Sequence, residues 1–334
     1  MERDRLRLKS FLAGLAAVAL SALPAAAQGF GTVERNETIF SPALGRDVAF
    51  NVYRPPAAPP AGARWPVVYL LEGRPSTSDW LDQGYVHEVV DRAVAEGDIP
   101  PSLIVTLSAP YSWYVDNPDP GGAGAVMTAL THDVVAAIDE RYPTAACREG
   151  RAIGGLSMGG YGAALYGFER PDLYVAAMSF SGAIAPPIGR AETERLDRAD
   201  AFYDGAFGTP MDRRRFNENT LFAKLEPLRG LGARKPALYL AAGDRDRGGL
   251  LQSTTRLHVE ALRAGLDSTL RIGPGQHDWP TWRAQLSDAL GWLGPRLDPT
   301  CGRAVARDEA FKSRAVPRLD PTCGRAVAGT APSR

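Results

Sequence analysis

The chain has 334 residues, of which 45% are hydrophobic and 23% are charged, and its 38 basic residues balance 38 acidic ones. This is the composition of a globular protein long enough for one large α/β domain or two small ones. The balanced charge provides no basic surface for nucleic acid and no acidic block, so it does not favour a polyanionic partner.

The N-terminal segment has the three parts of a secretory signal peptide. Four basic residues lie between Arg3 and Lys9, an apolar run extends from Phe11 to Leu23, and small residues end at Ala27. Residues 1–27 are therefore predicted to be a signal peptide that is cleaved near Ala27. A retained membrane anchor is the alternative, but the apolar run is too short to span a bilayer comfortably. The mature protein is expected to be secreted or periplasmic, with no stable membrane span.

Short apolar runs then alternate with segments of helical spacing. Strands are predicted at residues 47–55, 65–73, 102–108, 150–155 and 174–182, within 236–246, and at the start of 268–279. Helices are predicted at residues 85–97, 125–142, 159–170, 251–266 and 282–293. This alternation predicts one α/β domain over residues 28–296, with a mostly parallel central sheet and helices on both faces.

Two segments interrupt the alternation. Residues 109–124 form a long loop rich in proline, glycine and aromatic residues, and loops of this length in compact domains are usually functional or disordered. Residues 185–225 are charged and are predicted to be irregular. We interpret them as an insertion or small cap over the sheet.

The C-terminal region contains an identical duplication. The sequence PRLDPTCGRAVA occurs at residues 295–306 and again at 317–328. Two copies are too few for a solenoid, so residues 297–334 are interpreted as a tail extended by a local duplication. Export permits disulfides, and Cys323 is then the spare copy of Cys301. We predict a bridge from Cys147 to Cys301, with Cys323 as the alternative partner.

The stretch IGGLSMGGYGAAL, from Ile153 to Leu165, contains the pattern G-x-S-x-G centred on Ser157. In a nucleophile elbow the serine lies on a strained turn between a strand and a helix, and the flanking glycines avoid side-chain clashes. The pattern alone is weak in a chain this rich in glycine, and a plain glycine-rich turn is the alternative. Its position between a short strand and a small-residue helix favours the elbow.

A serine nucleophile needs a base, and that base needs an orienting acid. In this arrangement the chain order is serine, then an acid, then histidine. His277 lies in the loop after the last predicted strand and is the predicted base. The other histidines, His87, His132 and His258, lie within helical patterns and are interpreted as structural.

The acid is expected at the end of the strand in LYLAAGDRD, where Asp244 and Asp246 are both candidates. Asp278, next to the predicted base, is interpreted as structural. Trp113 and Tyr114 in the long loop are candidate substrate contacts, although core packing is the commoner fate of such residues.

Six segments together resemble the α/β-hydrolase esterases that include S-formylglutathione hydrolases, feruloyl and acetyl-xylan esterases, tributyrin-type esterases and secreted mycolyltransferases. They are PVVYLLEG, YSWYVDN, GGLSMGGYGAALYGFERPDLY, MSFSG, GDRD and PGQHDWPTW. The resemblance extends from about Ile39 to Leu293 and implies the α/β-hydrolase fold. It also implies oxyanion donors at the backbone N–H groups of Arg74 and Met158, and an acid at Asp246.

The resemblance has departures. Many esterases of this group have His-Gly where this chain has Glu72-Gly73, whereas mycolyltransferases have an acidic residue there, and SWYVDN also resembles their loop. GDRD is closer to the esterases. The resemblance therefore leaves open whether water or an alcohol accepts the acyl group.

These features predict an exported serine ester hydrolase that acts through Ser157, His277 and Asp246 on a small-molecule or carbohydrate-linked ester. An acyltransferase that transfers the acyl group to a sugar or alcohol is the alternative. A non-catalytic binding protein of the same fold is a third possibility, although no member of the triad is missing. The sequence shows no metal-ligand spacing and no phosphate-binding loop, so neither a cofactor nor a metal is expected.

Overall fold

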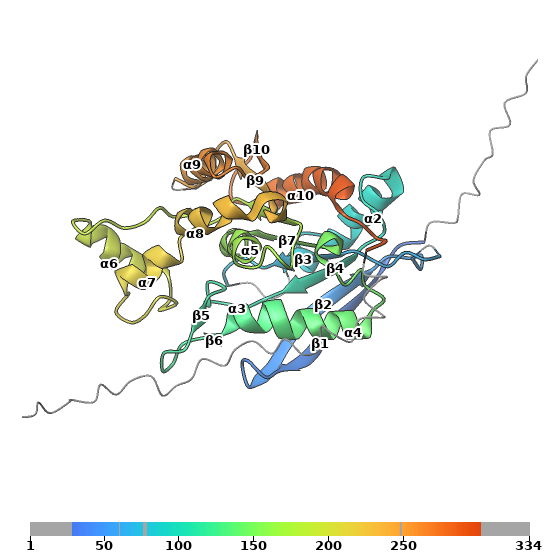
Figure 1. Ribbon diagram of the computed structural model, residues 1–334, viewed down its shortest axis with the longest axis horizontal. Helices are drawn as coiled ribbons and strands as arrows, with labels where there is room; N and C mark the ends of the chain where they lie inside the picture. The colour runs from blue at the N-terminus through green and yellow to red at the C-terminus, as the bar shows by residue number, and fades with distance from the viewer. Residues whose placement is uncertain (1–28, 60, 76–78, 248, 302–334) are drawn as a thin grey trace, which may run out of the picture.

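The computed structural model describes residues 29–59, 61–75, 79–247 and 249–301 (Figure 1). The predicted signal peptide and the predicted tail beyond Cys301, including Cys323, lie outside these residues.

In the described part of the chain, eight strands form one sheet in the order β1-β2-β4-β3-β7-β8-β9-β10. Their bounds are β1 Thr32–Ser41, β2 Arg46–Arg54, β3 Val67–Leu71, β4 Leu103–Leu107, β7 Arg151–Leu156, β8 Ala176–Phe180, β9 Ala237–Gly243 and β10 Ser268–Gly273. β1, β2 and β4 pair antiparallel, whereas every pairing from β4 to β10 is parallel. The carboxyl ends of the parallel strands therefore meet at one edge, where α/β sheets place their ligands.

Helices cover both faces of this sheet because its central strands are apolar on both sides. The helices and short helical turns are α1 Asp79–Asp82, α2 Val86–Glu96, α3 Val126–Thr128, η1 Ala129–Asp133, α4 Val134–Arg141, η2 Arg148–Gly150, α5 Met158–Glu169, α6 Thr193–Phe202, α7 Arg213–Glu218, α8 Leu221–Leu228, η3 Arg229–Arg234, α9 Leu250–Arg263, α10 Trp279–Leu293 and η4 Gly294–Arg296. Along β3, Tyr69 and Leu71 join the core beneath α4, α5, α8 and α9, while Val68 and Leu70 join the core beneath α2 and α10. The predicted α/β architecture is confirmed.

Three details differ from the sequence prediction. The strand β1 was not predicted, since most of its residues remain partly exposed and the only buried ones are Ile39 and Ser41. The predicted helix at 125–142 includes a π-helical segment, η1. The long loop carries a short two-stranded ribbon, β5 Asp116–Asn117 and β6 Gly124–Ala125.

The prediction of an irregular segment at residues 185–225 is wrong, because α6, α7 and the start of α8 lie in it. Figure 1 shows α6 and α7 at one end of the molecule, beyond the sheet. Helix α6 buries none of its residues and has an ion pair from Arg198 to Glu194 one turn away. Its half-buried Leu196 and Ala199 pack against the core, but two such positions are too few to predict a helix.

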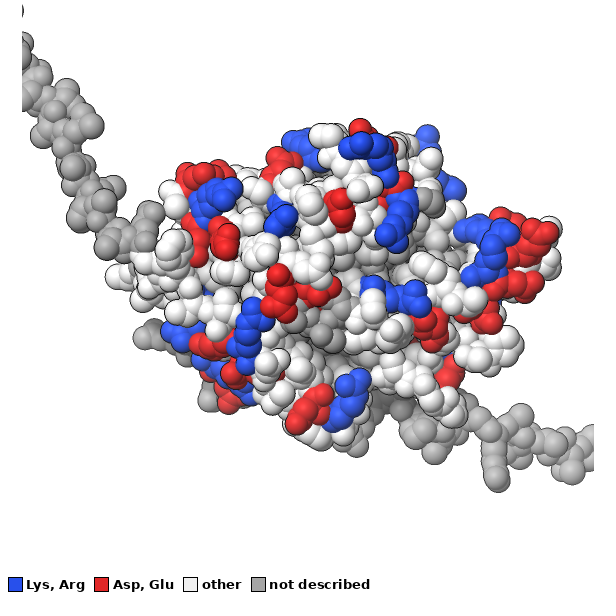
Figure 2. Space-filling view, turned by 180° about the vertical axis from the view of Figure 1, so that it is seen from behind, with Lys and Arg blue, Asp and Glu red and all other residues white. Residues whose placement is uncertain are grey.

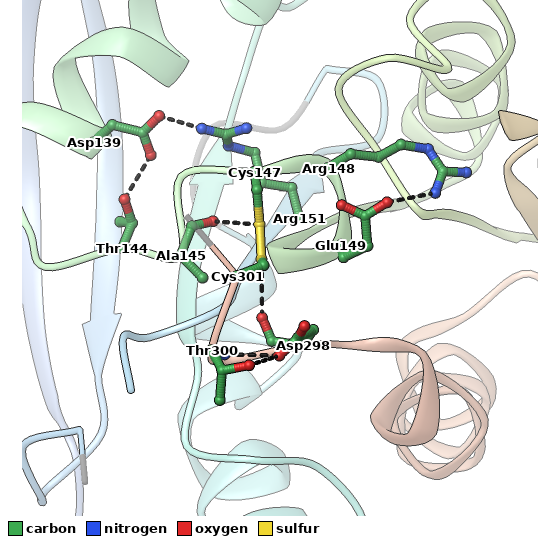
Figure 3. The surroundings of a disulfide bond; sticks show 10 residues. All are labelled: Asp139, Thr144, Ala145, Cys147, Arg148, Glu149, Arg151, Asp298, Thr300 and Cys301. Atoms are coloured by element: carbon green, nitrogen blue, oxygen red, sulfur yellow. Dashed lines mark hydrogen bonds and ion pairs between the residues drawn. A yellow bond between two sulfur atoms is a disulfide. The ribbon is translucent and has the colours of Figure 1, made fainter. Parts of the chain in front are cut away.

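A disulfide joins Cys147, just before η2 and β7, to Cys301 after the last helical turn (Figure 3). Two backbone hydrogen bonds hold the same terminal segment, from Asp298 N–H to the Glu149 carbonyl at 2.9 Å and from Arg64 N–H to the Pro299 carbonyl at 2.8 Å. The predicted Cys147–Cys301 pairing is confirmed.

Basic and acidic side chains are interspersed on the face shown in Figure 2. This face therefore has no continuous positive area among the described residues. Within the described ranges, no helix combines the length and the apolar character needed to cross a membrane.

Candidate active site

The candidate nucleophile lies on a sharp turn between a strand and a helix. Strand β7 ends at Leu156, α5 begins at Met158, and Ser157 between them has φ 52° and ψ −116°. A positive φ is strained for a residue with a side chain and persists only where the surrounding structure imposes it. Ser157 is held by backbone hydrogen bonds from its N–H to the Phe180 carbonyl at 2.9 Å and from Ala183 N–H to its carbonyl at 2.8 Å.

The flanking glycines allow this turn to pack against strand β3. A Cβ atom on Gly155 would lie 2.3 Å from the carbonyl oxygen of Gly159, and a Cβ atom on Gly159 would lie 2.3 Å from that of Leu71. Real Cβ atoms do not approach a carbonyl oxygen so closely, so only glycine fits at either position. The G-x-S-x-G pattern therefore has a steric cause in this fold.

Three side chains from distant parts of the sequence form one hydrogen-bonded line. His277 Nε2 lies 3.0 Å from Ser157 Oγ, and His277 Nδ1 lies 2.8 Å from Asp246 Oδ1. Ser157 follows β7, Asp246 follows β9, and His277 lies in the loop between β10 and α10. The imidazole can accept the hydroxyl proton on one nitrogen while it donates to the carboxylate on the other.

The surroundings of Asp246 keep its carboxylate charged although its side chain is fully buried. Burial raises the pKa of this carboxyl. Hydrogen bonds from His277 and from the Arg247 backbone N–H, together with the nearby Ser181 hydroxyl, lower the pKa by more than burial raises it, so the pKa lies below its usual value. A charged acid is what the imidazole needs in order to be oriented and then stabilised as a cation.

Ser181 is a buried neighbour of the triad that sequence reasoning did not single out. It follows β8 in a left-handed conformation, with φ 46°, and its N–H donates to the Ala241 carbonyl at 2.8 Å. Within the described residues, its Oγ and Asp246 Oδ2 are both buried without a hydrogen bond of good geometry. The MSFSG segment contains this serine, but nothing in the segment indicates that it faces the acid.

The alternative acid lies beside the line rather than in it. Asp244 Oδ1 accepts from Gly275 N–H at 3.0 Å and lies 3.5 Å from Arg245 Nε, so it braces the loop that carries His277. Asp278 caps α10 by accepting from Thr281 N–H at 3.1 Å.

The other histidines lie elsewhere. Nδ1 of His258 contacts Ser268 Oγ, Nδ1 of His132 contacts Asp133, and Nε2 of His87 lies 3.9 Å from Glu88 Oε1. His277 therefore differs from them in its place beside the serine.

The two candidate oxyanion donors flank Ser157. A Cβ atom built on Gly73 would lie 3.8 Å from Ser157 Cβ, so the loop after β3 that carries Arg74 passes next to the nucleophile. Met158 is the first residue of α5, and the first N–H groups of a helix have no acceptor inside the helix. Both residues line the same cavity as Ser157.

This cavity has a volume of about 490 Å³. Its lining includes Trp113, a candidate substrate contact whose side chain is almost fully buried. It also includes aromatic and aliphatic residues that were not singled out for this role, namely Phe202, Leu250, Trp279 and Trp282. The His277 ring meets Trp282 edge to face at 4.9 Å between centroids. The cavity therefore combines aromatic and aliphatic surface with the serine, the imidazole and the charged side chains of Arg74, Asp79 and Arg247. Small-molecule sites commonly combine apolar and polar groups in this way.

Tyr114 does not line this cavity. Its ring is fully buried and packs on Tyr166 at 6.2 Å, and its hydroxyl donates to the Glu72 carbonyl at 2.8 Å. In the described residues, no group of three or more His, Cys, Asp or Glu side chains is placed to hold a metal ion.

Comparison with known proteins identifies the family. The model of the family described as "Putative esterase" matches residues 41–293, which is most of the chain. The chain belongs to this esterase family.

Relatives of this esterase-family chain carry related names. An acetyl esterase of Caldicellulosiruptor saccharolyticus is 29% identical over 164 residues, which are 47% of this chain. The chain spans 59% of the length of that protein and 53% of the length of an uncharacterized protein of Corynebacterium glutamicum that is 25% identical over 234 residues. It thus covers just over half of these two relatives.

Solved structures share the fold of this esterase-family chain along nearly their whole length. A ferulic acid esterase has a TM-score of 0.65 at 26% identity, covering 80% of this chain and 100% of its own. An S-formylglutathione hydrolase from Agrobacterium tumefaciens has a TM-score of 0.61 at 22% identity, covering 82% and 97%. The α/β-hydrolase esterase fold and the family resemblance inferred from the sequence are confirmed.

Proposed function

We propose that this protein is an exported serine ester hydrolase that acts through Ser157, His277 and Asp246. The observation that carries the proposal is the unbroken hydrogen-bonded line from Ser157 Oγ through both imidazole nitrogens to Asp246. Membership of the esterase family supports an ester as the substrate.

The geometry supports acyl transfer in two halves. His277 removes the proton from Ser157 Oγ as that oxygen attacks the ester carbonyl, and the carbonyl electrons move onto the oxygen to give a tetrahedral oxyanion. The backbone N–H groups of Arg74 and Met158 stabilise this oxyanion, and one such donor contributes on the order of 3 kcal/mol. The alcohol leaves with the proton from His277, and water then releases the acid by the reverse sequence.

The cavity wall supports an ester with an apolar or aromatic part. Phe202, Trp279 and the edge of the mostly buried Trp282 contribute aromatic surface beside the nucleophile, and Trp113 backs this wall as a buried ring. Flat rings of this kind bind aromatic acyl groups and the faces of sugars by stacking. Acetyl and feruloyl esters, alone or linked to carbohydrate, are therefore the first substrates to test.

Export is part of the proposal. The signal-peptide pattern at residues 1–27 supports it, and so does the Cys147–Cys301 disulfide, since disulfides persist in oxidising compartments.

Hydrolysis of p-nitrophenyl acetate, butyrate and ferulate by the mature protein tests the proposal. We expect turnover by the wild type and a loss of at least about a thousandfold in kcat for Ser157→Ala, because the nucleophile is removed. Equal inactivity of both proteins toward all three esters would support the binding-protein alternative instead. Titration with an acceptor alcohol or trehalose tests the acyltransferase alternative, which requires an acyl product above the hydrolysis background.

A further inference from the structure

Asp204 lies two residues after α6, in the insertion, and its carboxylate contacts two other parts of the site. Arg74 Nε lies 2.7 Å from Asp204 Oδ2, and Arg74 Nη2 donates to Asp204 Oδ1 at 2.9 Å. The guanidinium thus meets the carboxylate through two parallel contacts. The indole N–H of Trp113 donates to Asp204 Oδ2 at 3.3 Å.

The contacted residues line the catalytic cavity, but Asp204 itself does not. Arg74 and Trp113 line the cavity of Ser157, whereas Asp204 lines a neighbouring cavity of about 440 Å³ together with Tyr111. The Arg74–Asp204 pair therefore stands between the two cavities. Asp204 can act on the reaction only through the residues that it holds.

The Arg74 side chain is fixed on more than one side. Its Cζ atom lies 5.4 Å from the centroid of the Tyr111 ring and 5.8 Å from that of Phe202. Only 35% of the Arg74 side chain and 19% of that of Asp204 are exposed. The Arg74 guanidinium meets the Asp204 carboxylate through two contacts and lies near two aromatic rings. Such a pair holds its side chains in place better than an exposed ion pair with a single contact, which contributes almost nothing to stability.

We propose that Asp204 is a positioning residue for the esterase site. Through Arg74 it fixes the loop that carries the proposed oxyanion donor, and through Trp113 it fixes part of the cavity wall. The inference rests on the proposed function. Donors in an oxyanion hole act by being held in place before the reaction. A loosened loop therefore lowers kcat. The ground-state ester interacts less with these donors, so KM changes little.

The chain offers a matched control. Arg215 of α7 pairs with Asp119 at 2.5 Å, and this pair also connects the insertion to the loop of residues 109–124. Neither residue lines the catalytic cavity. A general loosening of the insertion would therefore follow from Arg215→Gln as well as from Asp204→Asn, whereas a loss of positioning follows only from the latter.

The experiment measures kcat and KM for p-nitrophenyl acetate in the wild type, Asp204→Asn, Arg74→Gln, the double variant and Arg215→Gln, with thermal unfolding of each. We expect Asp204→Asn to lower kcat about tenfold with KM within twofold, and Arg215→Gln to leave both within twofold. Arg74→Gln keeps its backbone N–H. The double variant should be no slower than the slower single variant, because both changes break the same Arg74–Asp204 connection.

Two outcomes would overturn this inference and leave the proposed function standing. In the first, the wild type is active and Asp204→Asn is equally active. In the second, the losses of kcat in the two single variants multiply in the double variant. An inactive wild type would overturn the proposed function and this inference with it. Should Asp204→Asn unfold below the assay temperature, Arg74→Gln decides the question, and an unchanged kcat in that variant would also overturn the inference.

Discussion

Ser157 has a backbone conformation that sets its hydroxyl apart from the surrounding chain. Its φ is positive, and its Oγ lies 3.0 Å from His277 Nε2. The surrounding structure imposes this conformation. Gly155 and Gly159 pack against neighbouring carbonyl groups, and the Ser157 N–H donates to the Phe180 carbonyl. The geometry that the proposed mechanism needs at this residue is thus a consequence of the packing around it.

Sequence reasoning left two candidates for the acid, and Asp246 contacts His277 Nδ1 whereas Asp244 contacts Gly275. Asp246→Asn should lower kcat by about 10³ to 10⁴, because an amide cannot hold the required imidazole tautomer or stabilise its charged form. Asp244→Asn is the control and should lower kcat only a few fold, since Asp244 braces the loop through Gly275. Steady-state kinetics with p-nitrophenyl acetate measures kcat for both variants. A larger loss of kcat in Asp244→Asn than in Asp246→Asn would reverse the assignment.

At the scale of elements, the parallel strands bring the site together. The strands β7, β9 and β10 are each followed, directly or within a few residues, by a member of the triad. Their carboxyl ends lie at one edge of the sheet, so residues 120 positions apart in the sequence meet there. The antiparallel hairpin of β1 and β2 lies at the other end of the strand order from β9 and β10. A carboxylate of η1 connects the turn of this hairpin to the helical segment.

That carboxylate belongs to Asp133, which accepts from Ser41 Oγ at 2.5 Å and from Ala43 N–H at 3.1 Å. Burial raises the pKa of this carboxyl, but the Ser41 hydrogen bond, the His132 contact and the Ala43 N–H lower it more, so that it lies below its usual value. A group whose pKa is lower in the folded state stabilises the fold above its unfolded pKa of about 3.9. That contribution disappears as the pH falls through the folded pKa.

Asp133→Asn should therefore lower the free energy of unfolding at pH 7 by about 1 to 2 kcal/mol, and the difference from the wild type should shrink below about pH 4. Urea unfolding between pH 7 and pH 3 measures it. Glu194→Gln on α6, whose ion pair is almost fully exposed, is the control and should change the free energy by less than about 0.5 kcal/mol. A difference that is constant with pH would contradict the role of the Asp133 charge.

The central elements could be predicted from the sequence because a buried parallel strand such as Val67–Leu71 is continuously apolar. The elbow could be predicted because close packing restricts its flanking positions to glycine. β1 and α6 could not, since each has too few buried apolar residues to give a periodic signal. The Asp204 contacts also could not, because they depend on how an insertion folds back onto a loop about 90 residues earlier.

At the scale of the whole molecule, the Cys147–Cys301 disulfide closes a long loop, because its two cysteines are 154 positions apart in the sequence. The C-terminal segment that follows α10 is thereby held against the segment that precedes β7, the strand that leads to Ser157 (Figure 3). Because the cross-link restricts the unfolded chain, it stabilises the fold without touching the site.

Cys147→Ser should lower the free energy of unfolding by roughly 2 to 4 kcal/mol and leave kcat within twofold. Cys323→Ser, in the duplicated segment, is the control and should change neither quantity. Denaturant unfolding and peptide mapping under non-reducing conditions check both statements. A Cys147–Cys323 peptide, or equal destabilisation by the two variants, would contradict the pairing.

Reaction with an alkyl fluorophosphonate tests the role of Ser157 most directly, because a nucleophilic serine displaces fluoride and keeps the phosphonyl group. Mass spectrometry of the wild type should show one phosphonyl adduct per chain, mapped to Ser157, with esterase activity lost in proportion to labelling. Ser157→Ala should remain unlabelled. An adduct on another residue that persists in Ser157→Ala, or ester turnover by a protein that leaves Ser157 unlabelled, would contradict the account.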